Sequence, residues 1–332
     1  MKLIVQIPCY NEEGTIARTI EDIPRHIAGV DSVEVLIIDD GSSDRTVERA
    51  LKAGADHLIG FAQNRGLAAA FNAGLDEAVK LGADVIVNTD GDNQYRGECI
   101  PDLVGPIVRG EADVVVGARP IDKIEDFSWL KKRLQRLGSW LVRKVSATDV
   151  SDATSGFRAF SRQAAVRLTV VSSFTYTHET LIQAGRSGMA VAEVPVRTNE
   201  RTRPSRLFKS IPEYIARSLS TIGRIYTLYQ PFTFFSIIAA LLFCVGAALA
   251  GRYAYYYAMG QGGGHVQSVL ASGVLVILAM QAFIVGIVAD LIAANRKLLQ
   301  DLLARLRQAQ AMERDTPHQA HEEPIRELSR LR

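Results

Sequence analysis

Apolar, β-branched runs alternate with amphipathic stretches over the first two thirds of the chain. Five runs of this kind are present, at residues 3–7, 33–38, 83–88, 112–117 and 191–196. Their length and composition predict strands, and several of the stretches between them predict helices. Strands that alternate with helices indicate a parallel βαβ sheet, with functional groups at the carboxyl ends of the strands. Pro195 in the last run indicates an edge strand or a bulge.

Polar and acidic turns follow three of these runs. The turns are Pro8-Cys9-Tyr10-Asn11-Glu12-Glu13, Asp39-Asp40-Gly41-Ser42-Ser43-Asp44 and Thr89-Asp90-Gly91-Asp92-Asn93-Gln94. A fourth run ends near Arg119, so acids and a base are expected at one edge of the sheet. Open α/β sheets bind ligands at this edge, and we therefore expect the functional site there.

The third turn has the composition of a metal site. A glycine between Asp90 and Asp92 allows a sharp bend, so both carboxylates and the Gln94 carbonyl could converge on one hard cation, Mg²⁺ or Mn²⁺. A magnesium ion held by few protein oxygens completes its shell with water and substrate phosphates, which indicates a metal–diphosphate complex. The alternative is an Asp-Gly turn with two solvated carboxylates.

Two long uncharged stretches predict membrane-spanning helices. No formally charged residue lies between Arg224 and Arg252. Residues 231–250 are enough to cross about 30 Å of hydrocarbon at about 1.5 Å per residue. Residues 266–289 form the second predicted span, after the glycine-rich stretch 260–264, which we interpret as the flexible connection of a hairpin.

Basic residues flank the outer ends of this hairpin, whereas its connection contains only Arg252. They are Arg206, Lys209, Arg217 and Arg224 before it, and Arg296, Lys297, Arg305 and Arg307 after it. The positive-inside rule therefore predicts a multi-pass protein of a bacterial or archaeal plasma membrane, with the N-terminal domain and both termini in the cytoplasm.

The flanking segments complete the expected organisation. Apolar residues at steps of three and four over residues 211–226 predict a helix in the membrane interface. A similar pattern over residues 292–306 predicts another such helix or a subunit contact, which leaves a homo-oligomer open. The polar residues from about Glu313 onward are expected to be poorly ordered. The predicted parts are an α/β domain (1–208), an interfacial region (209–229), a hairpin (230–294) and a helix with a polar tail (295–332).

Composition narrows the class further. The chain has 332 residues, of which 48% are hydrophobic, so it can bury a full domain and still contribute a membrane segment. The net charge of +2 gives no indication of nucleic acid as a partner. Three cysteines without a Cys-x-x-Cys pair argue against a disulfide framework or a zinc site, and fit a reducing compartment. The strand-like N-terminus predicts no secretory signal.

Five motifs occur in the order and approximate spacing of family 2 glycosyltransferases. The motifs are residues 7–13, residues 38–44, Asn64-Arg65-Gly66, Asp90-Gly91-Asp92 and Ser155-Gly156-Phe157-Arg158. Over roughly residues 3–210 the sequence resembles the polyprenyl-phosphate sugar transferases of the dolichol-phosphate mannose synthase type. The resemblance implies a GT-A fold with a mainly parallel sheet. It also implies metal-dependent, inverting transfer of a glycosyl group from a UDP- or GDP-hexose to undecaprenyl or dolichyl phosphate.

The resemblance also implies roles for single residues. Pro8, Tyr10, Glu12, Asp40 and Asp90 would line the nucleotide-sugar pocket, whereas Asp39 would support its turn. The metal ligands would be Asp90, Asp92 and Gln94. Arg119 and Arg133 would hold the acceptor phosphate, together with Arg203 of the basic segment 197–207, which is too poor in apolar residues to be core. Asp92, Arg119, Arg133 and Glu179 are the expected catalytic residues.

Glu179 has two interpretations. It lies on a helix predicted over residues 174–184, and it is either the catalytic base found near this position in related transferases or a carboxylate that interacts with the helix dipole. Because a lipid phosphate is already an anion, its attack requires positioning more than deprotonation. His178 is expected to be structural, since no second histidine lies at metal-ligand spacing.

Two other functions fit parts of this pattern. Processive polysaccharide synthases share the fold but resemble one another in a Gln-x-x-Arg-Trp element, which neither Trp129 nor Trp140 completes. A non-catalytic membrane scaffold could retain the fold to bind a sugar nucleotide. Such a scaffold would not need its catalytic residues, so the presence of Asp90, Asp92 and Arg158 argues against it.

Overall fold

The computed structural model describes most of the chain in two compact units. The described residues are 1–119, 140, 142–143, 146, 148–170, 176–199, 223–224, 227 and 229–315. One unit comprises Met1–Ser218 with Gln300–Arg332, and the other comprises Leu219–Leu299. The predicted boundaries at residues 208, 229 and 294 stay predictions.

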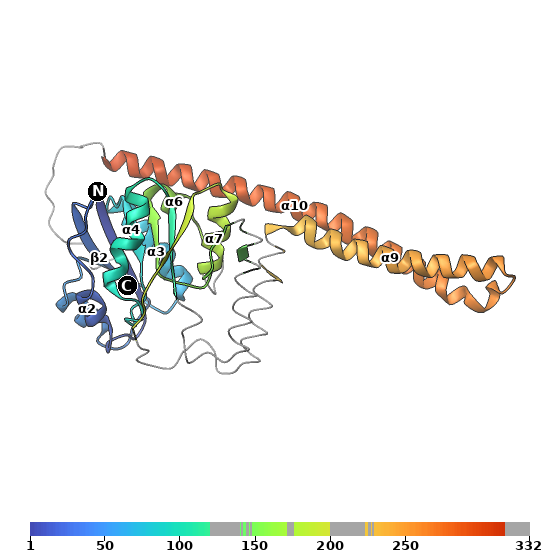
Figure 1. Cartoon of the computed structure of the whole chain (residues 1–332), viewed down its shortest axis with the longest axis horizontal. Helices are drawn as coiled ribbons and strands as arrows, with labels where there is room; N and C mark the ends of the chain where they lie inside the picture. Colours follow the sequence, from blue (N-terminus) through green and yellow to red (C-terminus); the bar gives the residue numbers. More distant parts are fainter. Residues whose placement is uncertain are drawn as a thin grey trace. The chain divides into compact units, whose positions relative to one another are not determined.

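A seven-stranded sheet forms the centre of the first unit (Figure 1). Its strands are β1 (Lys2–Cys9), β2 (Ser32–Asp39), β3 (His57–Gly60), β4 (Val85–Asn88), β5 (Val114–Ala118), β6 (Arg158–Ser161) and β7 (Val191–Pro195). Their order is β3-β2-β1-β4-β6-β5-β7, and β6 runs antiparallel to both of its neighbours while the other pairs are parallel. The predicted mainly parallel sheet is confirmed, and β7 with Pro195 lies at its edge.

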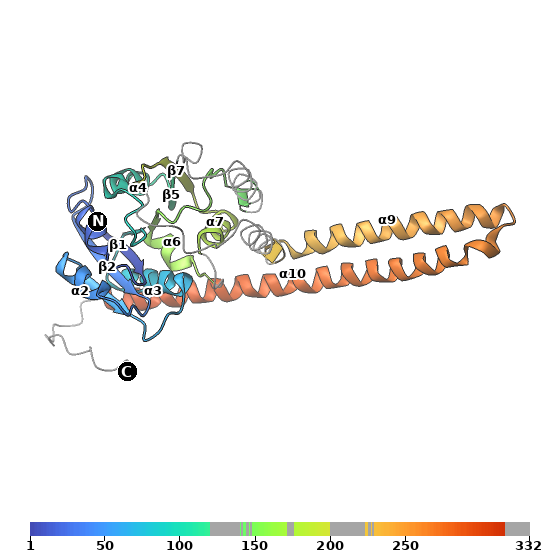
Figure 2. The same ribbon diagram turned by 90° about the horizontal axis from the view of Figure 1, so that it is seen from below.

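Helices cover both faces of this sheet (Figure 2). They are α1 (Ile16–Glu21), α2 (Thr46–Lys52), α3 (Leu67–Lys80), α4 (Ile100–Val108), α6 (Arg162–Arg167) and α7 (Thr177–Arg186). Side chains of α1, α2 and α4 share one hydrophobic core with Leu3 and Val5 of β1, and those of α3, α6 and α7 share another with Ile4. Alternate residues of a strand face opposite sides, so burial on both sides explains the continuous apolar runs.

The sequence pattern did not predict several of these elements. The edge strand β3 is only four residues long and no more than partly buried, so it lacks a continuous apolar run. Arg158 begins β6 and interrupts its apolar character, although the side chain is fully buried. Two prolines, Pro101 and Pro106, weaken the helical pattern of α4.

The second unit contains two helices that are long and apolar enough to cross a membrane. They are α9 (Pro231–Ala258) and the part of α10 (Val266–Asp315) up to Leu299, whose most apolar 18-residue stretches have mean hydropathies of 2.4 and 2.5. Only 11% of each of these stretches is buried, whereas a core helix of a soluble domain is mostly buried. A short 3₁₀ helix, η3 (Gly262–His265), lies in the predicted connection. Residues 292–306 continue α10 without a break, because no glycine or proline follows Gly286 in this helix.

Small residues at seven-residue intervals allow α9 and α10 to pack closely. They are Ala239 and Gly246 on α9 and Ser272, Ala279 and Gly286 on α10, all of them buried. A Cβ atom on Gly246 would lie 3.2 Å from Val276 Cγ2, and one on Gly286 would lie 3.0 Å from Phe235 Cβ. Small residues at such positions let two helix backbones approach in a membrane, and the seven-residue period favours a left-handed crossing.

Candidate active site

The acidic turn after β4 is held by α1 on one side. Thr15 Oγ1 and Thr19 Oγ1 donate hydrogen bonds to the Gly91 carbonyl, at 2.8 and 3.2 Å. The Gln94 main-chain N–H donates to Asp92 Oδ1 at 3.1 Å, which is the bond of an Asx turn. These contacts place the Asp90 and Asp92 carboxylates at the carboxyl end of the central strand β4, as the sequence predicts.

The end of the segment after β7 holds the same turn from the other side. Asn199 donates its main-chain N–H to the Gln94 carbonyl at 2.8 Å and its Nδ2 to the Asn93 carbonyl at 3.0 Å. Asn93 adopts a left-handed φ of 54°, a conformation that asparagine tolerates better than most residues. The main-chain carbonyl of Gln94, one of the predicted cation ligands, thus accepts a hydrogen bond from Asn199.

Four charged side chains interact around this turn. Burial raises the pKa of the Asp90 carboxyl to about 7, with further upward effects of Asp92 and Glu12 and an opposing effect of Arg119. Gly156 lets a second loop approach, since a Cβ atom there would lie 3.2 Å from both Asp90 carboxylate oxygens. The acids and Arg119 therefore form one electrostatic cluster.

The acidic pair fits a divalent cation that substrate oxygens also bind. Two crowded carboxylates at Asp90 and Asp92 supply hard oxygen ligands, which Mg²⁺ and Mn²⁺ prefer. Among the described residues no group of three His, Cys, Asp or Glu side chains could enclose a metal ion. The protein alone thus offers an open site, whose other ligands would be water or phosphate oxygens.

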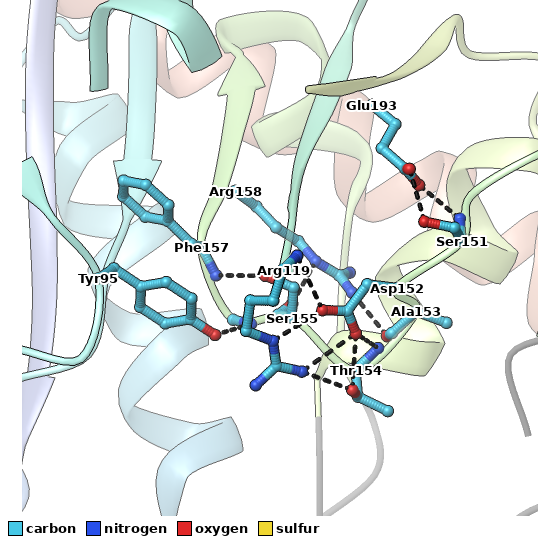
Figure 3. A network of polar contacts seen from close by, with 11 residues as sticks. Tyr95, Arg119, Ser151, Asp152, Ala153, Thr154, Ser155, Phe157, Arg158 and Glu193 are labelled. Atoms are coloured by element: carbon cyan, nitrogen blue, oxygen red, sulfur yellow. Dashed lines mark hydrogen bonds and ion pairs between the residues drawn. The ribbon is translucent and has the colours of Figure 1, made fainter. Parts of the chain in front are cut away.

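The predicted acceptor residue Arg119 is already paired by one edge of its guanidinium (Figure 3). Nε donates to Asp152 Oδ2 at 2.7 Å, and Nη2 donates to Asp152 Oδ1 at 3.0 Å and to Thr154 Oγ1 at 2.8 Å. Burial opposes the charge on Arg119, but neighbouring groups that include Asp152 and Asp90 raise its pKa above the ordinary value. Arg119 is therefore a fixed cation rather than a side chain free to form two parallel bonds to phosphate.

Arg158 of the Ser-Gly-Phe-Arg motif is a supporting residue beneath the site. Its side chain is fully buried and donates to the carbonyls of Ala153, Ser155 and Thr177, at 2.9, 2.9 and 2.5 Å, and to Thr180 Oγ1 at 2.6 Å. Burial lowers its pKa to about 10. These bonds join the loop before β6 to α7.

On the predicted nucleotide side, the two aspartates of the second turn bind the main chain. Asp39 accepts from the Ser42 N–H at 3.1 Å and supports its turn, as expected. Both Asp40 oxygens accept from main-chain N–H groups, those of Arg65 at 2.7 Å and Gly66 at 2.9 Å. Asp40 is 4% exposed, so it orders the Asn64-Arg65-Gly66 loop.

The other predicted pocket residues lie on both sides of the β1 terminus. Pro8 is buried within β1 opposite Ile38, whereas Tyr10 exposes 41% of its surface. Glu12 accepts from Thr15 Oγ1 at 3.3 Å and also acts electrostatically on Asp90. Tyr10 and Glu12 directly follow β1 and precede both the nucleotide loops and the acidic turn in the chain, and their assignment to the pocket stays a prediction.

Glu179 lies in the first turn of α7, is 3% exposed and accepts from Gln183 Nε2 at 3.3 Å. Burial lowers the pKa of the neighbouring His178 to about 4, so this imidazole is neutral at pH 7. Arg133 and Arg203 lie outside the described residues. Arg119 is therefore the predicted acceptor residue that can be placed.

Sequence reasoning missed two residues that organise this site, Asp152 and Asn199. Their partners Arg119 and Gln94 are far away in the sequence, so no local pattern relates them. The one available signal was the position of Asp152, three residues before the Ser155-Gly156-Phe157-Arg158 motif.

A mainly parallel sheet with helices on both faces and an acidic turn at the carboxyl end of a central strand is the arrangement of the GT-A glycosyltransferase fold. The chain belongs to glycosyl transferase family 2, whose model matches residues 4–169, half of its length. Its fold is similar to that of glucosyl-3-phosphoglycerate synthase from Mycobacterium tuberculosis, solved with Mn²⁺, uridine diphosphate and phosphoglyceric acid. This likeness has a TM-score of 0.52 at 25% identity and covers 68% of this chain and 78% of the other.

Two curated relatives are similar over more than half of the chain. The chain is 30% identical over 217 residues to the UDP-N-acetylglucosamine–dolichyl-phosphate N-acetylglucosaminyltransferase of Methanococcus voltae, covering 58% of this chain and 83% of the relative. It is 33% identical over 211 residues to the dolichyl-phosphate hexose transferase of Haloferax volcanii, covering 62% and 86%. The predicted family and enzyme class, glycosyltransferase, are confirmed.

Proposed function

We propose that this enzyme transfers a hexosyl group from a UDP- or GDP-sugar to a polyprenyl phosphate in a membrane, with inversion at the anomeric carbon. The observation that carries the proposal is the cluster of Asp90, Asp92 and Arg119 at the ends of β4 and β5. It offers a cation site and a fixed positive charge to two anionic substrates. The relatives named for dolichyl phosphate support the acceptor, and the structure with uridine diphosphate and Mn²⁺ supports the donor.

Asp90 and Asp92, with Gln94, would hold Mg²⁺ or Mn²⁺. When bound, the cation neutralises charge on the departing nucleoside diphosphate. The protein supplies two carboxylates on a turn whose main chain is held from both sides by Thr15, Thr19 and Asn199.

The acceptor phosphate is an anion at neutral pH, so its oxygen can attack the anomeric carbon without prior deprotonation. Arg119 contributes a cation that is held in place by Asp152 and offsets repulsion between the two substrates. Arg133 and Arg203 are proposed as further contacts of this phosphate. The burial of Glu179 and its bond to Gln183 favour a supporting role over that of a base.

Two span-length helices in the same chain favour a lipid acceptor over a soluble one. We propose that α9 and α10 form a transmembrane hairpin and that the glycosyltransferase domain and both termini are cytoplasmic, because basic residues flank the hairpin at its outer ends.

A transfer assay tests the proposal. Full-length protein in detergent is incubated with labelled UDP- and GDP-sugars, with undecaprenyl or dolichyl phosphate, and with Mg²⁺, Mn²⁺ or EDTA. Label is expected in an organic-soluble, metal-dependent product, and the product's anomeric configuration tests inversion. Insoluble polymer would instead favour a processive polysaccharide synthase, and binding of a sugar nucleotide without turnover would favour a scaffold.

A further inference from the structure

The loop over residues 151–156 anchors Arg119, and this loop is itself rigid. The Asp152 side chain, which is 0% exposed, occupies the Nε–Nη2 edge of Arg119, whose side chain is 11% exposed (Figure 3). Below it, the buried Arg158 guanidinium binds the carbonyls of Ala153 and Ser155, on either side of Thr154. Arg119 is therefore attached to a main chain that cannot readily move with it.

Both ends of the loop are fixed as well. Ser151 Oγ donates to Glu193 Oε1 at 2.6 Å at one end, and the Gly156 N–H donates to the Tyr95 hydroxyl at 3.2 Å at the other. Gly156 also lies against the Asp90 carboxylate. A single rigid loop thus carries the anchoring carboxylate and borders the acidic turn.

Stability alone does not explain why Arg119 and Asp152 form a buried ion pair. An apolar pair of similar volume is often as stable as a buried ion pair, because charges lose hydration on burial. The ion pair does fix the orientation of the Arg119 guanidinium, since a planar guanidinium bound through two nitrogens cannot rotate. Among the described residues no hydrogen bond is made by Arg119 Nη1, so the third nitrogen of the fork is available to a ligand.

We propose that Asp152 is a positioning residue for glycosyl transfer: it fixes the Nε–Nη2 edge of Arg119 and thereby presents Nη1 to the acceptor phosphate. Thr154 assists, because its hydroxyl accepts from Arg119 Nη2 and donates to Asp152 Oδ1 at 2.8 Å. The inference rests on the proposed function, since it takes an anionic acceptor as the ligand of Arg119.

The expected signature is a difference between turnover and binding. Asp152→Asn keeps the size of the side chain but removes its charge and one acceptor. We expect kcat to fall about 10- to 100-fold, because small misplacements of a positioning group have effects of this size. The KM of the acceptor should not rise, since a negative charge near its phosphate is lost, and the KM of the donor should stay unchanged.

A double-mutant cycle separates positioning from a merely structural role. The four proteins are the wild type, Asp152→Asn, Arg119→Gln and the double variant, each full-length in detergent and assayed with undecaprenyl phosphate. If Asp152 acts through Arg119, Asp152→Asn has little further effect on kcat once Arg119 is Gln. A structural role would lower kcat by the same factor in both backgrounds. The active fraction of each protein is obtained from binding of UDP or GDP with Mn²⁺.

Each result decides one question. Absence of transfer by the wild type with any sugar nucleotide would refute the proposed function itself. Transfer by the wild type together with equal effects of Asp152→Asn in both backgrounds would refute only the positioning role. If Asp152→Asn does not fold, Thr154→Val replaces it in the same cycle. Thr154→Val is expected to lower kcat by a smaller factor when Arg119 is present, and to have no effect on kcat in the Arg119→Gln variant.

Discussion

Acid should destabilise this protein through His178, and the substitution His178→Gln should remove that effect. Burial is the main cause that lowers the pKa of His178, from its ordinary value of 6.5 to about 4; the positive charge of Arg158 adds to it and Asp152 opposes it. The imidazole is thus neutral in the folded protein, whereas the unfolded chain binds a proton below about pH 6.5.

The sign and size follow from this difference in proton binding. Above pH 6.5 both states are neutral at His178, so the residue costs no stability. Stability is lost as the pH falls from about 6.5 towards 4, by about 2 kcal/mol at pH 5 and about 3 kcal/mol at pH 4. For a domain of this size, 2 kcal/mol corresponds to a Tm shift of about 4–8 °C.

The assay is thermal unfolding of the full-length protein in detergent at pH 7.5 and pH 5. Other groups also titrate in this window, so the informative quantity is the difference between wild type and His178→Gln. Between pH 7.5 and pH 5 the Tm of His178→Gln is expected to fall by several degrees less than the Tm of the wild type. His26→Gln serves as the matched control and should behave as the wild type, because the His26 side chain is exposed. An equal fall in Tm for the wild type and His178→Gln would refute the reasoning.

Two further predictions concern the site. Arg119→Gln should raise the KM of the lipid acceptor more than that of the sugar nucleotide, measured by varying each substrate at saturating levels of the other; equal increases would contradict its assignment to the acceptor. Asn199→Ala removes the bond from Nδ2 to the Asn93 carbonyl and should weaken Mn²⁺ binding about 2- to 10-fold, the equivalent of one hydrogen bond, as measured by electron paramagnetic resonance. Asn72→Ala is the control, because it removes comparable amide bonds to Val170 away from the turn and should leave Mn²⁺ affinity unchanged.

The strands that form the centre of the sheet could be predicted because both of their faces are buried. Val85–Asn88 and the first two strands read as apolar runs, and each ends in a polar turn. By contrast, β6 begins with the charged Arg158, whose burial depends on carbonyl groups contributed by other parts of the chain. A charged residue in a short segment gives no sequence signal of a central strand.

The same distinction applies to the site. Asp90 and Asp92 could be identified because the spacing, the glycine and the preceding strand are local features. Asp152 lies 33 residues from Arg119, and Asn199 lies 105 residues from Gln94, so their roles depend on the sheet bringing β5, β6 and β7 together. The occupied edge of Arg119 is likewise a tertiary feature, because Asp152 reaches Arg119 only through the fold.

The most direct test of the account is the transfer of labelled sugar to undecaprenyl phosphate by the wild type and by Asp92→Asn, both full-length and in saturating Mg²⁺ or Mn²⁺. The account predicts a lipid-linked product with the wild type and essentially none with Asp92→Asn, although the variant unfolds at the same temperature as the wild type. Turnover of Asp92→Asn close to that of the wild type would contradict the assignment of the acidic turn as the metal and donor site.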